Sequence, residues 1–216
     1  MHRLAIFDLD DTLIDRRSAV GSAVASLCLA RDYEPAVEQW LRAELADRAN
    51  PADFARLSTV FRLQEPAEEL WQEYVDLMGA FAACRPTVLE GLAQLRAAAW
   101  TIGIATNGPS DIQRAKLAAT GITELVEGIA VSGDIDARKP DRRLFDLAAT
   151  RCGRRLSDGG WMIGDNPAGD IEGGRRAGLR TIWIRGRSWP DPLAEPHHAV
   201  DDVTDAIAIL LNELPE

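Results

Sequence analysis

The feature that most constrains the fold is a series of short apolar runs separated by segments with helical periodicity. Five runs are rich in branched or apolar residues, and each ends in a turn. Continuous apolar runs of this length are typical of parallel strands that are covered on both faces. We therefore predict strands at Arg3–Asp8, Thr101–Thr106, Gly128–Gly133, Trp161–Asp165 and Thr181–Gly186. A weaker run at 197–202 precedes a predicted closing helix at 203–214.

The segments between these strands carry signals for helix starts and stops. Ser110 is a suitable N-cap for a helix that stops at Gly121, and a second predicted helix runs from Pro140 to Gly153. A short glycine-rich helix is predicted at 170–179. Strands that alternate with helices indicate βαβ units. The predicted class is therefore α/β, with a Rossmann-like parallel sheet and helices on both of its faces.

One long stretch breaks this alternation. Residues 16–85 show no strand pattern, and their apolar residues recur at the i, i+3, i+4 spacing of amphipathic helices. We predict about four helices here, punctuated by Asn50, Pro51 and Pro66. The predicted organisation is a Rossmann-like core domain at 1–15 and 86–216 with an inserted helical cap subdomain at 16–85.

Composition excludes several classes of protein. The net charge of −10 argues against a nucleic-acid partner and against an anionic membrane partner. No apolar stretch approaches the roughly 20 residues that cross a bilayer, and the first residues lack the pattern of a secretory signal. The three cysteines are widely spaced, which favours a reducing cytoplasm over a disulfide scaffold or a zinc site. The oligomeric state is left open between monomer and homodimer.

Ligands of open parallel sheets bind at the carboxyl ends of the strands, so the residues predicted there are the candidate site. These ends gather four carboxylates, a hydroxyl, an amide and one of only two lysines in the chain. The candidate residues are Asp8, Asp10, Thr106, Asn107, Lys139, Asp165 and Asp170.

This set suits phosphoryl transfer through a covalent intermediate. Asp8 can attack phosphorus as the nucleophile. Asp8 and Asp165, together with a backbone oxygen, suit Mg²⁺, which prefers oxygen ligands. Asp10 can give a proton to the leaving alcohol and then take one from water, and this requires a raised pKa. Asp11 has no role in this scheme.

The remaining polar groups can bind the phosphate. The Thr106 hydroxyl, the Asn107 N–H and the Lys139 ammonium can hold its non-bridging oxygens as charge shifts in the transition state. Asp170 can orient Lys139 or a metal-bound water from outside the metal shell.

Four short motifs carry a family resemblance. They are DLDDTL at 8–13, ATNG at 105–108, RKPD at 138–141 and GDNPAGD at 164–170. In this order they resemble the haloacid dehalogenase-like (HAD) hydrolase superfamily. The resemblance implies Asp8 as nucleophile, Asp10 as acid/base, Thr106 and Lys139 as phosphate ligands, and Asp165 as a Mg²⁺ ligand. It adds the Asp10 main-chain carbonyl as a further metal ligand, and it implies that the helical insertion is a substrate-selecting cap.

Within this superfamily the sequence favours a phosphatase. Family dehalogenases lack the second aspartate, whereas Asp10 is present here. Phosphonate-cleaving relatives and related mutases use a cap lysine, and residues 16–85 contain none. We expect a small phosphorylated metabolite as partner, either a nucleoside monophosphate or a sugar phosphate. A phosphomutase, or a non-catalytic phosphate-binding or receiver-like module, remains an alternative.

Overall fold

The computed structural model describes residues 3–213 and confirms the predicted α/β class. Within these residues the strands form one parallel sheet in the order β3-β2-β1-β4-β5-β6. The strands are β1 (Arg3–Phe7), β2 (Trp100–Thr106), β3 (Gly128–Val131), β4 (Trp161–Gly164), β5 (Arg180–Ile184) and β6 (His198–Val200). Strand β1 lies in the interior of the sheet, where Phe7 is in register with Ile104 of β2 and Ile163 of β4.

The helices follow the predicted alternation, with four of them in the inserted stretch. They are α1 (Arg16–Ala30), α2 (Pro35–Glu44), α3 (Pro51–Phe61), α4 (Ala67–Phe81), α5 (Pro86–Ala97), α6 (Ser110–Thr120), α7 (Arg142–Arg151), α8 (Gly173–Arg176) and α9 (Val203–Asn212). A π-helix, η4 (Pro167–Glu172), precedes α8, and single 3₁₀ turns lie at Thr123–Leu125, Ser132–Asp134 and Leu156–Asp158. The last residue of the predicted closing helix, Leu214, lies outside the described residues.

The described chain divides into two compact units. The sheet unit comprises the residues up to Ile14, Cys84–Asn107 and the residues from Gly121 onward. The helical unit comprises Asp15–Ala83 and Gly108–Thr120.

This division corrects the predicted domain assignment of helix α6. The sequence analysis places it in the sheet domain because it follows β2, but it belongs to the helical unit. Its buried Ile112 lies in the same apolar cluster as Leu70 and Tyr74 of α4. Packing of an apolar face, not position between two strands, decides where this helix belongs.

The correction changes one argument about the helical insertion. Lys116 lies on α6, so the helical unit does contain a lysine although residues 16–85 contain none. Its side chain is fully buried. The absence of a lysine therefore no longer argues against a mutase or a phosphonate-cleaving enzyme.

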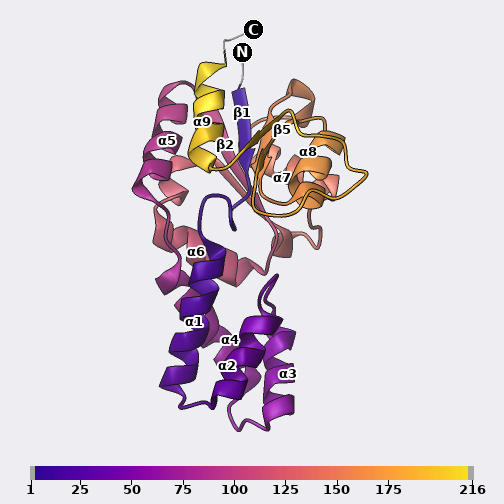
Figure 1. Ribbon diagram of the computed structural model, residues 1–216. Coiled ribbons are helices and arrows are strands. Elements are labelled where there is room, and N and C mark those ends of the chain that lie inside the picture. Colours follow the sequence, from indigo (N-terminus) through magenta and orange to yellow (C-terminus); the bar gives the residue numbers. More distant parts are fainter. Residues whose placement is uncertain (1–2, 214–216) are drawn as a thin grey trace. The chain divides into compact units, whose positions relative to one another are not determined.

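In the sheet unit, helices cover both faces of the sheet, as predicted. Helices α5 and α9 lie on one face, and α7 and α8 lie on the other (Figure 1). Leu4 and Ile6 of β1 share an apolar cluster with Leu144 and Phe145 of α7, and all four are buried. This burial on both faces explains why the strands read as continuous apolar runs.

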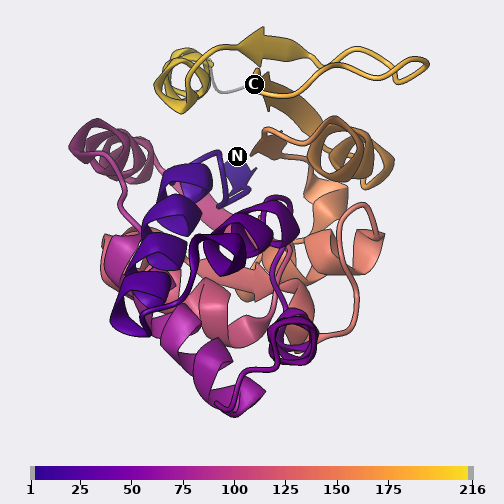
Figure 2. The ribbon, with the colours of Figure 1, turned by 60° about the horizontal axis from the view of Figure 1, so that its bottom comes forward.

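In the helical unit, α4 contacts α1, α3 and α6 (Figure 2). The Trp71 indole N–H of α4 donates to Asp111 Oδ2 of α6 at 2.6 Å. The Arg16 guanidinium of α1 donates to the carbonyl oxygens of Leu45 and Ala46, just after α2, at 2.8 and 2.6 Å. A cation at the end of a helix binds carbonyls that the helix itself leaves without partners.

Among residues 3–213, every helix is too short or too polar to span a bilayer.

Candidate active site

The site begins where β1 ends. The strand ends at Phe7, one residue earlier than predicted, so Asp8 is the first residue beyond it. The Asp8 N–H donates to the Ile163 carbonyl of β4 at 2.8 Å, which fixes its backbone. The Asp8 side chain is buried, and Thr12 Oγ1 lies 3.5 Å from Asp8 Oδ2. The sequence therefore places a carboxylate at the sheet edge, where Ile163 binds its main chain and Thr12 contacts its side chain.

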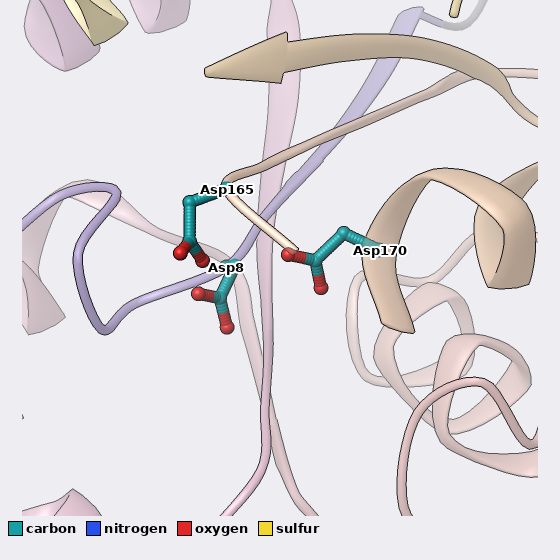
Figure 3. A group of neighbouring side chains, drawn as sticks. All are labelled: Asp8, Asp165 and Asp170. Carbon is teal, nitrogen blue, oxygen red and sulfur yellow. The ribbon is translucent and has the colours of Figure 1, made fainter. Parts of the chain in front are cut away.

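Two further carboxylates meet Asp8. Asp165 directly follows β4 and Asp170 lies on η4, and both are buried (Figure 3). One carboxylate oxygen from each of Asp8, Asp165 and Asp170 lies within 4.8 Å of the other two. Figure 3 shows the three side chains gathered at the strand ends. Gathering three buried carboxylates is costly without positive charge between them.

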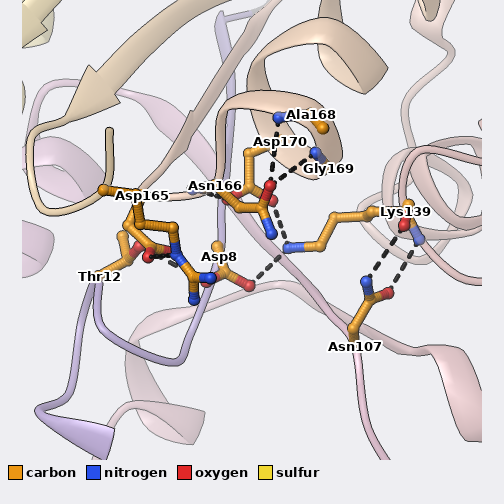
Figure 4. A network of polar contacts seen from close by, with 10 residues as sticks. Asp8, Thr12, Asn107, Lys139, Asp165, Asn166, Ala168, Gly169 and Asp170 are labelled. Carbon is orange, nitrogen blue, oxygen red and sulfur yellow. Dashed lines mark hydrogen bonds and ion pairs between the residues drawn. The ribbon is translucent and has the colours of Figure 1, made fainter. Parts of the chain in front are cut away.

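Lys139 supplies part of that charge. Its Nζ lies 2.5 Å from Asp8 Oδ1 and 2.6 Å from Asp170 Oδ1, so it bridges the two carboxylates (Figure 4). Burial by itself lowers the pKa of Lys139, but the Asp170 and Asp8 carboxylates outweigh burial and raise it. The ammonium therefore stays protonated at neutral pH.

The carboxylates themselves have perturbed pKa values. Burial raises the pKa of Asp8 well above its usual range; Lys139 opposes the rise, and the charges of Asp170, Asp165 and Asp10 add to it. Burial raises the pKa of Asp165 to about 6, although a hydrogen bond from Arg187 opposes the rise. Strong shifts with identified charge partners are typical of functional sites.

Asp170 has a contact at each of its carboxylate oxygens. Its Oδ1 faces Lys139, and its Oδ2 accepts from the Asn166 N–H at 3.0 Å. The Asn166 side chain in turn accepts from the Ala168 and Gly169 N–H groups at 3.1 and 2.9 Å. With both oxygens engaged, Asp170 is suited to orienting Lys139.

Asn107 contacts Lys139 through its side chain as well. Its Oδ1 accepts from the Lys139 N–H at 2.8 Å, and its Nδ2 donates to the Lys139 carbonyl at 3.2 Å (Figure 4). The sequence analysis assigns only the Asn107 N–H, as a phosphate donor. The structure adds a positioning contact across 32 residues of chain.

Thr106 and Asp10 complete the predicted set. Thr106 is the last residue of β2, is fully buried and is in register with Val131 of β3. Asp10 is half-buried and forms a backbone bridge with Ile14, and its charge raises the pKa of Asp8. Asp8, Lys139, Asp165 and Asp170 are thus in direct proximity, and Asp10 is close enough to act on Asp8 electrostatically.

Three site residues have no role assigned in the sequence analysis. Asn166 carries a readable signal, because an asparagine followed by proline is typical of a helix start. Gly164 is needed because a Cβ there would lie 2.2 Å from Asp170 Oδ2. Arg187 Nε donates to Asp165 Oδ2 at 2.6 Å from a loop 22 residues further along the chain, which no local pattern predicts.

The donor set fits a hard divalent cation. Three buried carboxylates at one point offer the oxygen ligands that Mg²⁺ prefers, and the described residues around them supply no sulfur ligand. Asp8, Asp165 and Asp170 each offer an oxygen to such an ion, and each also has a cationic partner: Lys139 pairs with Asp8 and Asp170, and Arg187 pairs with Asp165.

Comparison with known proteins identifies the family. The model of the haloacid dehalogenase-like hydrolases matches residues 2–178, and the chain belongs to this family of hydrolases. A phosphoserine phosphatase of Thermus thermophilus is 36% identical over 115 residues, which are 53% of this chain and 46% of that protein. The pyrimidine 5'-nucleotidase YjjG of Escherichia coli is 30% identical over 135 residues, 62% of this chain and 60% of that protein. The matched segments thus span about half to three fifths of these two relatives.

The fold recurs in solved structures. The HAD-hydrolase YfnB of Bacillus subtilis, solved with bound magnesium, superposes with a TM-score of 0.74 at 22% identity, covering 97% of this chain and 98% of that one. At this identity the likeness establishes the shared fold.

Proposed function

We propose that this protein is a Mg²⁺-dependent phosphatase that hydrolyses a small phosphomonoester through an aspartyl-phosphate on Asp8. The observation that carries the proposal is the buried cluster of Asp8, Lys139, Asp165 and Asp170. Support also comes from the relatives, which are a phosphatase and a nucleotidase, and from the magnesium bound in the YfnB structure.

In the first half-reaction, an Asp8 oxygen attacks phosphorus and the bond from phosphorus to the ester oxygen breaks. Asp10 gives its proton to the departing alkoxide. Lys139, oriented by Asp170 and Asn107, binds the non-bridging phosphate oxygens together with Thr106 and the Asn107 N–H. A bound Mg²⁺, held by Asp8, Asp165 and the Asp10 carbonyl, would supply charge neutralisation between two anions.

In the second half-reaction, a water attacks the same phosphorus. Asp10 now accepts a proton from this water, and the bond between phosphorus and the Asp8 oxygen breaks. Inorganic phosphate leaves and Asp8 is regenerated. Asp10 thus needs a proton at the start and must lose it at mid-cycle.

The substrate class is part of the proposal. A nucleoside monophosphate or a sugar phosphate is proposed, with no nucleic-acid or membrane partner, in a cytoplasmic monomer or homodimer. The three free cysteines support a reducing compartment. The helical unit is proposed as the substrate-selecting cap.

A phosphomutase is the second candidate, because the helical unit contains the buried Lys116. Product analysis separates the two functions. A phosphatase releases inorganic phosphate from a panel of nucleoside monophosphates, sugar phosphates and phosphoserine, whereas a mutase converts one sugar phosphate into its isomer. If no ester is turned over, both enzymatic functions are ruled out and the non-catalytic phosphate-binding module is the remaining alternative.

The covalent mechanism is tested by Asp8→Asn. An amide is a poor nucleophile, so we expect kcat to fall by about a thousandfold or more. Asp11→Asn is the matched control, because Asp11 has a φ of 57° and asparagine tolerates this left-handed conformation. Phosphate release is the measurement, and near-normal release by Asp8→Asn would rule out Asp8 as the nucleophile.

A further inference from the structure

Arg187 makes a contact with the site that the family motifs do not include. It lies between β5 and β6, and its Nε donates to Asp165 Oδ2 at 2.6 Å. In the proposed function the Asp165 carboxylate is a cation ligand. The Arg187 guanidinium and a divalent cation would therefore compete for the Asp165 carboxylate.

The main chain of Asp165 is held in place without Arg187. Its residue directly follows β4, and its main-chain carbonyl accepts from the Trp183 indole N–H at 3.0 Å. The Asp165 side chain is only 7% exposed. The Asp165 main chain is thus held at the sheet edge by strand and tryptophan contacts that involve no part of Arg187.

Arg187 is the more easily released partner. Its side chain is 43% exposed, whereas that of Lys139 is 3% exposed between two carboxylates. A half-exposed guanidinium regains hydration when it leaves, so its pair contributes little net free energy. Lys139 has no such compensation.

Charge also favours exchange. Asp8 and Asp170 pair with Lys139, and Asp165 pairs with Arg187. A divalent cation bound by Asp8 and Asp165 would add two positive charges beside the guanidinium and repel it.

We propose that Arg187 is an exchangeable counter-ion of Asp165, which a divalent cation displaces, and that Arg187 thereby lowers the affinity of the site for that cation. The inference rests on the proposed function, because it takes Asp165 as a cation ligand. Arg187 acts here through Asp165 and is a positioning residue, not a catalytic one.

Nearby tryptophans offer a signal of the exchange. Trp189, two residues beyond Arg187, packs on Trp183 with ring centroids 4.8 Å apart, and its indole N–H donates to the Leu193 carbonyl at 3.3 Å. We expect the segment that carries Trp189 to shift when Arg187 moves. Cation binding is therefore expected to change tryptophan emission.

The test is a titration of the protein with Mg²⁺ in the absence of substrate. Calorimetry measures the affinity, and tryptophan fluorescence measures the change in emission. We expect Arg187→Gln to bind Mg²⁺ about fivefold more tightly than the wild type and to show a smaller emission change. Arg185→Gln is the matched control, because Arg185 pairs with Asp201, which is 82% exposed. This control is expected to bind Mg²⁺ like the wild type, and Asp165→Asn is expected to weaken binding in either background.

Equal Mg²⁺ affinity in Arg187→Gln and the wild type overturns the inference, as does weaker affinity in the variant, which would mean that Arg187 orients Asp165. A wild type without measurable Mg²⁺ binding overturns it as well. Phosphate release by the wild type is measured separately. Turnover with an unchanged affinity in Arg187→Gln defeats only the counter-ion inference, whereas tighter binding without turnover of any ester defeats only the phosphatase.

Discussion

Gly164 determines how closely Asp170 approaches the end of β4. A Cβ at residue 164 would lie 2.2 Å from Asp170 Oδ2 and 2.5 Å from its Cγ. These separations are far below van der Waals contact, so a methyl group there displaces the carboxylate. Because the same carboxylate holds Lys139, the missing side chain of Gly164 is a condition for the geometry of the site.

We expect Gly164→Ala to lower the free energy of unfolding by about 1–3 kcal/mol through overpacking. Urea denaturation measures this loss. The double variant Gly164→Ala with Asp170→Ala is expected to be less destabilised than the sum of the single changes, because the two closest clashes, with Oδ2 and Cγ of Asp170, are gone and only its Cβ, at 2.8 Å, remains. Gly186→Ala, where a Cβ would meet open space, is the control. Additive losses in the double variant would contradict the clash.

One contact of the site, between Asn107 and Lys139, shows where prediction from single residues stops. The types and order of Asp8, Thr106, Lys139 and Asp165 indicate the chemistry without a structure. The Asn107 side chain, however, binds the Lys139 main chain across 32 residues. A hydrogen bond between two loops depends on where the fold places them, so no local sequence pattern predicts it.

At the scale of elements, the N-terminus of α9 is tied to the start of α5. Asp202 caps α9 by accepting from the Thr204 N–H at 2.9 Å. Its carboxylate also pairs with Arg85, the residue before α5, at 2.7 Å. The Arg85 hydrogen bond, with those of Thr204, lowers the pKa of Asp202 to about 2.

A carboxylate with a lowered pKa stabilises the fold only while it is ionised in the folded state. The contribution of Asp202 is present above the ordinary value near 4 and is lost as the pH falls toward about 2. We expect Asp202→Ala to cost about 1–2 kcal/mol at neutral pH, mostly through the lost cap. Asp202→Asn, which keeps a capping oxygen, should cost less. Urea denaturation between pH 7 and about 2 measures both, and an unchanged acid dependence in Asp202→Ala would refute the assignment.

Most elements follow from the sequence because strands and helices differ in apolar period. The predicted strands all appear, with ends shifted by a few residues. The ends shift because a strand stops where its backbone hydrogen bonds to the adjacent strands stop. Helix α5 was not predicted, although Pro86 begins it and Val88, Leu92 and Leu95 form its buried face. The signal for this helix is therefore present in the sequence, between the insertion and β2.

At the scale of the whole molecule, each unit has an apolar core of its own. In the helical unit, Phe54, Leu57 and Tyr74 are fully buried in one cluster. In the sheet unit, Leu144 and Phe145 are fully buried in another. Separate cores allow the two units to differ in local stability.

We expect Leu57→Ala to destabilise the helical unit by about 2–5 kcal/mol, the usual cost of such a cavity. Hydrogen exchange should accelerate in 15–83 and 108–120 and stay slow in the sheet unit. Leu144→Ala, an equally buried leucine of the sheet unit, is expected to show the opposite distribution. Uniform acceleration across both units in either variant would show that they unfold together.

The sequence by itself determined the α/β class, the helical insertion and the edge where the site lies. It could do so because apolar period distinguishes strands from helices, and parallel strands bring their carboxyl ends to one edge. Only the tertiary structure decided that α6 packs with the helical unit, that Gly164 makes room for Asp170, and that Arg187 pairs with Asp165. Each of these depends on contacts between residues that are not chain neighbours, and a local pattern contains no information about such contacts.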